Sequence, residues 1–123
     1  MAHRKQFGGT VLIVDDDLAS RKALEAVLAD EGYTVATAAD GGAALAYLRS
    51  GHKPDVILLD LMMPVLDGWD FRTEQKRDPA LADIPVVAIS AAGKLVDGDY
   101  SLRKPIRLEM LLDILQKIVG AAI

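Results

Sequence analysis

The most restrictive feature of the sequence is a run of four apolar residues, Val56–Leu59, that leads directly into a single carboxylate, Asp60. A short apolar run bounded by turn residues is typical of a strand buried on both faces. Pro64 and Asp67-Gly68 then favour a turn. Asp60 is therefore predicted at the carboxyl end of a central strand, where open α/β sheets bind ligands. Taken alone, an aspartate here fits a turn or a helix cap equally well.

The same pattern of apolar strands alternating with helical segments recurs along the whole chain. Strands are predicted at Val11–Val14, Thr34–Ala39, Asp55–Asp60, Pro85–Ile89 and Asp99–Arg103. Helices are predicted at Leu18–Glu31, between Asp40 and Gly51, at Trp69–Arg77 and at Arg107–Val119. Asp17 and Asp40 are placed to cap the first two helices. This alternation predicts an α/β fold, a doubly wound parallel sheet with right-handed crossovers and helices on both faces.

A parallel sheet brings the first polar residue after each strand to one edge. Five such residues are expected to converge there: Asp15, Asp16, Asp60, Ser90 and Lys104. Three gathered carboxylates repel one another unless a cation compensates them. Oxygen ligands without histidine or cysteine suit Mg²⁺, and a lysine with a hydroxyl suits a phosphoryl group. An aspartate in such a setting can act as the nucleophile in phosphoryl transfer.

The overall composition narrows the classes of function. A length of 123 residues suits one domain, predicted at residues 10–123 after a flexible lead-in at residues 1–9. The net charge of −4 argues against a nucleic-acid surface, and the absence of cysteine excludes disulfides and thiolate zinc sites. With no apolar run near eighteen residues and no signal-peptide pattern, a cytoplasmic domain without membrane contact is expected. His3 and His52 lack partners for histidine catalysis.

The strongest motif is the run from Asp60 to Gly68, which fits the pattern D-x-x-M-P-x-x-D-G. Together with Asp15-Asp16, Ser90 and Lys104-Pro105 in chain order, it resembles the receiver domain of two-component response regulators. The resemblance extends from about Val11 to Val119. It implies a flavodoxin-like, five-stranded parallel sheet with the strand order 2-1-3-4-5.

The resemblance also implies a role for each acidic residue. Asp60 would be the phosphoacceptor and would contribute to the Mg²⁺ site. Asp16 would bind Mg²⁺ directly, and Asp15 mainly through water. The backbone carbonyl of Met62 would be a further metal ligand.

The remaining motif residues would serve the phosphoryl group. Ser90 would hydrogen-bond it, in place of the threonine common in the family, and Lys104 would pair with its oxygens before a cis Lys104–Pro105 bond. The partners implied are a sensor histidine kinase or phosphotransfer protein and, downstream, a protein partner or a second copy. The domain would then be a phosphoacceptor signalling domain and not an enzyme, beyond self-phosphorylation and autodephosphorylation.

One segment departs from the family pattern. Only thirteen residues separate Ser90 from Lys104, where a helix and a strand are normally found. The fourth helix is therefore predicted to be missing or reduced to a turn between Ala91 and Asp99. Ser101 stands where the family carries its switch aromatic, and Tyr100 lies one residue earlier. Loss of the helix should expose part of the sheet, and the alternatives for this surface are a partner, a dimer mate or a flexible region.

Two other functions stay open on the sequence alone. The shortened segment is compatible with a protein-interaction module that keeps the receiver fold but whose output does not depend on phosphorylation. A phosphatase of the haloacid-dehalogenase type is a poorer fit, because Met62 stands where such enzymes carry a second aspartate.

Overall fold

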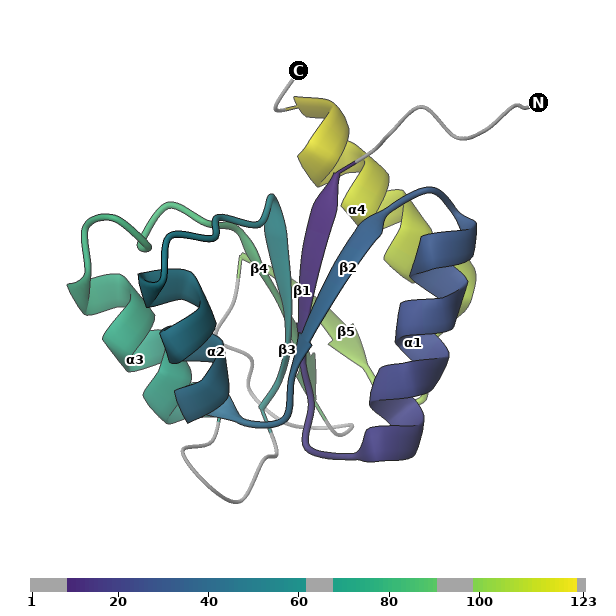
Figure 1. The fold of residues 1–123 in the computed structure, drawn as a ribbon. Helices are drawn as coiled ribbons and strands as arrows, with labels where there is room; N and C mark the ends of the chain where they lie inside the picture. The colour runs from purple at the N-terminus through teal and green to yellow at the C-terminus, as the bar shows by residue number, and fades with distance from the viewer. Residues whose placement is uncertain (1–8, 62–67, 91–98, 122–123) are drawn as a thin grey trace.

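A single parallel sheet organises the computed structural model, which describes residues 9–61, 68–90 and 99–121. Its strands are β1 (Thr10–Val14), β2 (Thr34–Ala38), β3 (Val56–Asp60), β4 (Val86–Ser90) and β5 (Tyr100–Arg103). All neighbouring pairs are parallel, and the order is β2-β1-β3-β4-β5. The predicted strand order is confirmed (Figure 1).

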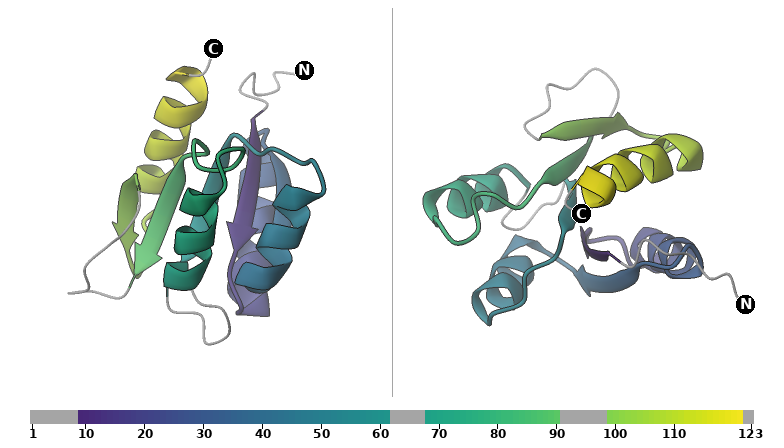
Figure 2. Two further views of the ribbon diagram at one scale, coloured as in Figure 1. Left: turned by 90° about the vertical axis from the view of Figure 1, so that its left-hand side faces the viewer. Right: turned by 90° about the horizontal axis from the view of Figure 1, so that it is seen from above.

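Four helices cover the two faces of this sheet. They are α1 (Leu18–Asp30), α2 (Gly41–Arg49), α3 (Gly68–Arg77) and α4 (Leu108–Ala121). Helices α1 and α4 lie on one face, and α2 and α3 lie on the other (Figures 1 and 2). The predicted helix ends agree with these bounds to within about two residues, which is the usual uncertainty of helix ends.

The apolar strands contribute to a core on each side of the sheet. In β3, Ile57 and Leu59 pack beneath α2 and α3, whereas Val56 and Leu58 pack beneath α1 and α4. Successive strand residues point to opposite faces, so a strand covered on both faces needs an unbroken apolar run. Asp60, at 4% exposed, is therefore held at the end of one of the most deeply buried strands.

The sequence signals for helix ends act as expected. The Asp17 carboxylate accepts a hydrogen bond from the Ser20 backbone N–H at 2.9 Å, and that of Asp40 accepts one from Ala43 at 2.8 Å. Each bond satisfies one of the free N–H groups of a first helical turn. Beyond the second helix, Gly51 has a φ of 106°, a left-handed conformation that favours glycine.

Helix α3 contains a buried polar group that the sequence reading missed. Phe71 is fully buried as expected, but Arg72 and Gln75 are also buried, at 3% and 0% exposed. The Gln75 amide nitrogen donates to the carbonyls of Leu81 and Ile84 at 2.9 and 3.0 Å. Its amide oxygen accepts a 2.8 Å hydrogen bond from Arg72.

Arg72 extends this group to the edge of the sheet. Its second guanidinium nitrogen lies 3.4 Å from the Asp99 carboxylate, at the start of β5. The other oxygen of Asp99 accepts from the backbone N–H of Val86 at 2.9 Å. The buried group thus joins α3, the loop before β4 and the beginning of β5.

We expect Gln75→Met to lower the free energy of unfolding by about 2 to 4 kcal/mol, because it leaves two buried carbonyls and a buried guanidinium donor without this amide. Methionine has a similar volume, so packing changes little. Urea unfolding measures the loss, and Lys76→Met, at an exposed position of the same helix, is the control. Equal unfolding midpoints for the two variants would contradict this role for Gln75.

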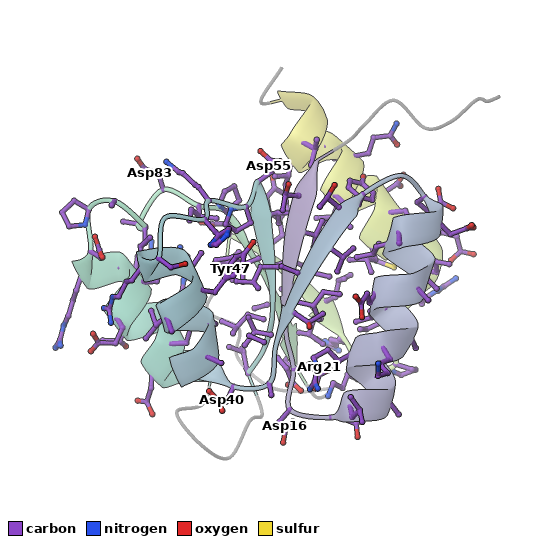
Figure 3. The ribbon with its side chains drawn as sticks, in the orientation of Figure 1. Asp16, Arg21, Asp40, Tyr47, Asp55 and Asp83 are labelled. Atoms are coloured by element: carbon purple, nitrogen blue, oxygen red, sulfur yellow. The ribbon has the colours of Figure 1, made fainter. Side chains whose placement is uncertain are left out.

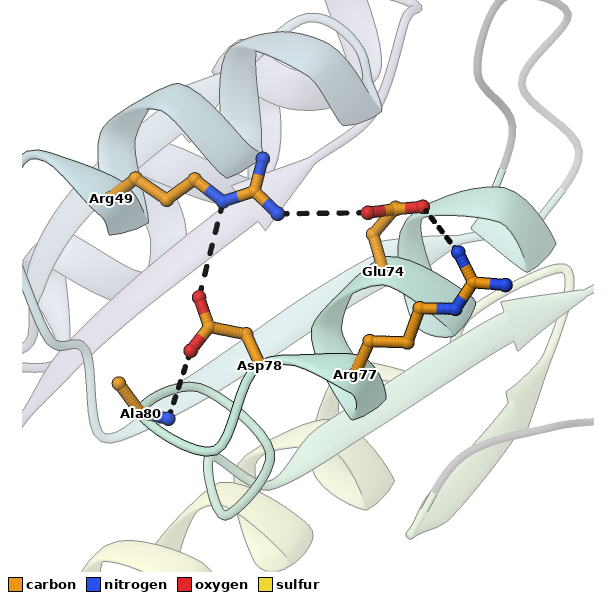
Figure 4. A network of polar contacts seen from close by, with 5 residues as sticks. All are labelled: Arg49, Glu74, Arg77, Asp78 and Ala80. Atoms are coloured by element: carbon orange, nitrogen blue, oxygen red, sulfur yellow. Dashed lines mark hydrogen bonds and ion pairs between the residues drawn. The ribbon is translucent and has the colours of Figure 1, made fainter.

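A second polar network links α2 to α3 at the surface (Figure 4). Arg49 lies 3.6 Å from Glu74 and 4.0 Å from Asp78, and Arg77 lies 3.4 Å from Glu74. Asp78 also accepts a hydrogen bond from the backbone of Ala80, in the turn after the helix. Exposed ion pairs contribute little to stability, so this network adds little to the free energy of unfolding.

Two predictions concern the less regular parts of the chain. Gly9, predicted to belong to a flexible lead-in, is instead buried: its carbonyl accepts from Thr34, and an added Cβ would meet Val119 at 2.9 Å. Residues 1–8 lie outside the described part of the chain. The predicted loss of a helix between Ala91 and Asp99 concerns residues 91–98, which also lie outside it.

Strand β5 lies at the edge of the sheet, and most of its side chains are exposed to solvent. Leu102 is buried against the α4 side, but Tyr100, Ser101 and Arg103 are exposed. Among the strands of the described residues, β4 is its one neighbour. Across the described helices, none combines the length and apolar character that crossing a membrane requires.

Candidate functional site

The polar residues that follow the strands meet at the carboxyl edge of the sheet, the lower edge in Figure 3, where Asp16 is labelled. Asp15 and Asp16 follow β1, Asp60 ends β3, and Ser90 ends β4. The strand register places them at a common level, because Val14 pairs with Leu59 and Asp60 pairs with Ile89. The structure brings oxygens of Asp15, Asp16 and Asp60 together and places Ser90 at the end of the neighbouring strand.

Three carboxylates form the centre of the site. Asp15, Asp16 and Asp60 each offer an oxygen, and these oxygens lie within 4.8 Å of one another. Asp15 and Asp60 are buried, and Asp16 is exposed to solvent. Burial raises the pKa of Asp15 above its ordinary value, with a further increase from the charge of Asp60, against a lowering by its hydrogen bond from Asp17. The three carboxylates thus repel one another, and a bound cation would stabilise their charged forms.

Lys104 supplies a cation at the side of this cluster. Its Nζ lies 3.3 Å from Oδ2 of Asp60, and its side chain is 46% exposed. The backbone N–H of Lys104 donates to the carbonyl of Ser90 at 2.9 Å, which fixes the start of the side chain. Because the backbone of Lys104 is held while its side chain is exposed, the ammonium group can move from Asp60 toward an incoming anion.

Ser90 ends β4 and directly follows Ile89, the residue that pairs with Asp60. Ser90 is 1% exposed, and its Oγ has no hydrogen-bond partner among the residues that the structure describes. A buried hydroxyl without a hydrogen-bond partner is unfavourable unless a bound group supplies that partner. Ser90 therefore fits a site that receives a hydrogen-bond acceptor such as a phosphoryl oxygen.

The loop between β1 and α1 holds Asp15 by several hydrogen bonds. Its backbone N–H donates to the carbonyl of Ala38 at 3.1 Å, and its Oδ1 accepts from the backbone of Asp17 at 2.9 Å. Its own carbonyl accepts a 2.8 Å hydrogen bond from Nη1 of Arg21. Sequence reasoning missed Arg21, because the only signal was its place one turn into the helix that follows three aspartates.

An open cavity of about 330 Å³ adjoins the cluster. Its lining comes from α1, the end of β4 and the segment after β5: Asp15, Ser20, Ala23, Leu24, Ile89, Lys104, Pro105 and Ile106. Apolar side chains thus surround an approach to two of the site residues. A partner could reach the cluster from this side.

The family resemblance predicted two further details of the site, and the structure tests one of them. The Lys104–Pro105 peptide bond is cis, as predicted. The Met62 carbonyl lies outside the described residues, so its place in the metal site stays a prediction. His52 is an exposed loop residue, as predicted, and its ring stacks on Tyr47 with ring centroids 4.5 Å apart.

The donor set decides what the site could hold. Carboxylate oxygens with no histidine or cysteine suit a hard divalent cation such as Mg²⁺, which commonly binds one or two carboxylates and keeps several waters. A cation there would also offset the repulsion that accompanies the raised pKa of Asp15. The residues present therefore fit a magnesium ion next to an anion held by Lys104 and Ser90.

Comparison with known sequences gives the same picture. The sequence model of the response regulator receiver domain matches residues 11–116. The chain is 44% identical over 87 residues to a probable transcriptional regulator, ycf27, of Guillardia theta, but spans only 33% of that protein. It is 36% identical over 113 residues to the protein PilG of Pseudomonas aeruginosa, covering 85% of this chain and 83% of PilG.

Comparison with solved structures extends the similarity to the fold. The chemotaxis response regulator CheY4 of Vibrio cholerae matches with a TM-score of 0.82 at 32% identity, over 90% of this chain and 98% of CheY4. A receiver domain of the Francisella response regulator 1452 matches with a TM-score of 0.83 at 25% identity, over 94% of this chain and 100% of that domain.

Proposed function

This chain belongs to the response regulator receiver family, and on that premise we propose that it accepts a phosphoryl group on Asp60 in a two-component phosphorelay. The observation that carries the proposal is the position of Asp60. Its carboxylate offers an oxygen within 4.8 Å of oxygens of Asp15 and Asp16, and its Oδ2 lies 3.3 Å from the Lys104 ammonium. A nucleophile close to both a candidate cation site and a mobile positive charge suits phosphoryl transfer.

Asp15, Asp16 and Asp60 would hold Mg²⁺. The ion supplies positive charge against the phosphoryl oxygens and against the carboxylates that surround them. Asp60 then provides the nucleophilic oxygen, which its place at the end of a buried strand holds in a constant direction.

The transfer step forms one bond and breaks one. An oxygen of Asp60 forms a P–O bond as the P–N bond of a phosphohistidine breaks, and the electron pair of that bond stays on the imidazole nitrogen. Lys104 shifts from the Asp60 carboxylate to the phosphoryl oxygens, and the Ser90 hydroxyl donates to another of them. Donors that are already in place lower the cost of the charge that develops on those oxygens.

The donor would be the phosphohistidine of a sensor kinase or a phosphotransfer protein. The open cavity beside Asp15 and Lys104 offers it a route, since its lining combines apolar side chains with two site residues. This proposal keeps the cytoplasmic location expected from the sequence. Output through a downstream protein or a second copy of the chain belongs to the same proposal.

The direct test uses a small phosphodonor in place of the kinase. Incubation with phosphoramidate and Mg²⁺ should add one phosphoryl group per chain by intact mass, and the label should decay over time. Excess EDTA should prevent it, because the three carboxylates then repel the incoming anion without compensation. Unchanged mass with Mg²⁺ and donor, and also with a competent kinase, would rule out this function.

A receiver-fold interaction module remains the second candidate. The observation in its favour is that Ser101, where the family carries its switch aromatic, is exposed on the edge strand. Amide hydrogen exchange separates the two. Phosphorylation that leaves exchange in β5 and α4 unchanged, and also leaves the oligomeric state unchanged, favours the module.

A further inference from the structure

Arg21 contacts the site from outside the set of residues that the sequence pointed to. It lies on α1, is half-buried, and donates from Nη1 to the carbonyl oxygen of Asp15 at 2.8 Å. That carbonyl belongs to the peptide unit joining Asp15 to Asp16, whose two carboxylates are both in the acidic cluster. Arg21 thus contacts the backbone between two candidate metal ligands.

The other contacts of Asp15 show what this one adds. Its N–H is bonded to β2 through Ala38, and its Oδ1 accepts from the backbone of Asp17. These two bonds hold the backbone N–H and the carboxylate of Asp15, but neither holds its carbonyl oxygen. A peptide plane turns about its two flanking dihedrals, and a turn here redirects the side chain of Asp16. The carbonyl oxygen is instead held by the side chain of Arg21, which approaches it from α1.

Resting on the proposed function, we propose that Arg21 is a positioning residue for the Mg²⁺ site. Its hydrogen bond holds the Asp15–Asp16 peptide unit in the orientation that directs both carboxylates toward Asp60. Partners that orient ligands in this way commonly change metal affinity by about 10- to 100-fold when removed.

Electrostatics alone gives the opposite expectation. A guanidinium close to a cation site repels the cation, so its removal should strengthen Mg²⁺ binding. Positioning predicts weaker binding after the same removal. The sign of the change therefore separates the two effects.

Helix formation does not depend on the guanidinium. The first turn of α1 is capped by Asp17, and the backbone N–H of Arg21 donates to the carbonyl of Asp17 at 2.9 Å. Both bonds survive any substitution of the Arg21 side chain other than proline. A change in metal affinity can thus be separated from a loss of the helix.

The test compares Arg21→Met with Lys22→Met. Lys22 is the next residue on α1 and is exposed, so its variant removes the same charge without the contact to Asp15. Titration of each protein with MgCl₂ in a calorimeter should show about tenfold weaker binding for Arg21→Met. Lys22→Met should match the wild type or bind slightly more tightly. Arg21→Lys, which keeps a charged donor, should lie between wild type and Arg21→Met.

Phosphorylation by phosphoramidate gives a second readout. Arg21→Met should need about tenfold more Mg²⁺ for half-maximal rate, yet reach the wild-type rate at saturation, since Asp60 and Lys104 are untouched. Circular dichroism and thermal unfolding without metal report whether the variant is folded.

The outcomes separate this proposal from the proposed function. If the wild type binds Mg²⁺ and is phosphorylated, but Arg21→Met and Lys22→Met have equal affinities, Arg21 does not position the site and the function stands. If the wild type binds no Mg²⁺ at millimolar concentrations, both proposals fail. If Arg21→Met has a lower rate at saturating Mg²⁺ with unchanged affinity, Arg21 acts elsewhere and the positioning role is wrong.

Discussion

Asp60→Asn is expected to abolish the incorporation of phosphate from phosphoramidate. Asparagine has nearly the same shape as aspartate, but its amide oxygen is a poor nucleophile and cannot form a stable acyl phosphate. The substitution also removes one of the three carboxylates that gather within 4.8 Å and the charge that faces Lys104. Intact mass after incubation with donor and Mg²⁺ should show the unmodified chain alone.

A matched control excludes a general effect of removing an acid. Asp83→Asn makes the same change at an exposed loop residue near the opposite edge of the sheet (Figure 3). It should accept phosphate like the wild type. Circular dichroism should confirm that both variants are folded. Phosphate on the Asp60→Asn protein in the same amount as on Asp83→Asn would assign the acceptor to another residue.

Lys104→Met is expected to slow phosphorylation by about 100- to 1,000-fold, which is the usual cost of removing one preorganised group that stabilises the transition state. The ammonium lies 3.3 Å from the Asp60 oxygen, close to where phosphoryl oxygens would come. Methionine keeps most of the length and apolar part of the side chain. The initial rate with phosphoramidate at saturating Mg²⁺ measures the effect.

The same variant should keep the fold and the metal site. Lys104 is 46% exposed but its partner Asp60 is only 5% exposed, so the free energy of unfolding should fall while circular dichroism still shows the folded protein. Mg²⁺ affinity should be equal to or slightly above that of the wild type, because a like charge is gone. Lys53→Met, exposed in the loop before β3, is the control and should keep the wild-type rate. A wild-type rate for Lys104→Met would exclude the lysine from the transfer step.

The architecture could be predicted because its signals are local and repeated. Strands buried on both faces need unbroken apolar runs, and Val56–Leu59 shows this as clearly as any segment. Once the strands are parallel, the convergence of Asp15, Asp60 and Ser90 follows from chain direction alone, without knowledge of any contact. The caps at Asp17 and Asp40 were predictable because each partner lies three residues away.

The polar contacts that were missed share a different property. Gln75 is satisfied by the carbonyls of Leu81 and Ile84, and Arg21 by the carbonyl of Asp15. Every residue type carries a backbone carbonyl, so the sequence does not indicate which carbonyl a side chain will contact. On α3, the sequence therefore showed no sign that Arg72 and Gln75 are buried.

The strand arrangement divides the site into a stiff half and a compliant half. The carboxylates belong to β1 and β3, each of which has a neighbour on both sides, whereas Lys104 follows β5, which has one neighbour and only four residues. Because β5 makes fewer hydrogen bonds to neighbouring strands, its position is held less strongly. A chemical event at Asp60 would thus meet less resistance at the sheet margin than in the ion-binding half. A signal generated here would leave through the margin, next to the residues of β5 that face solvent.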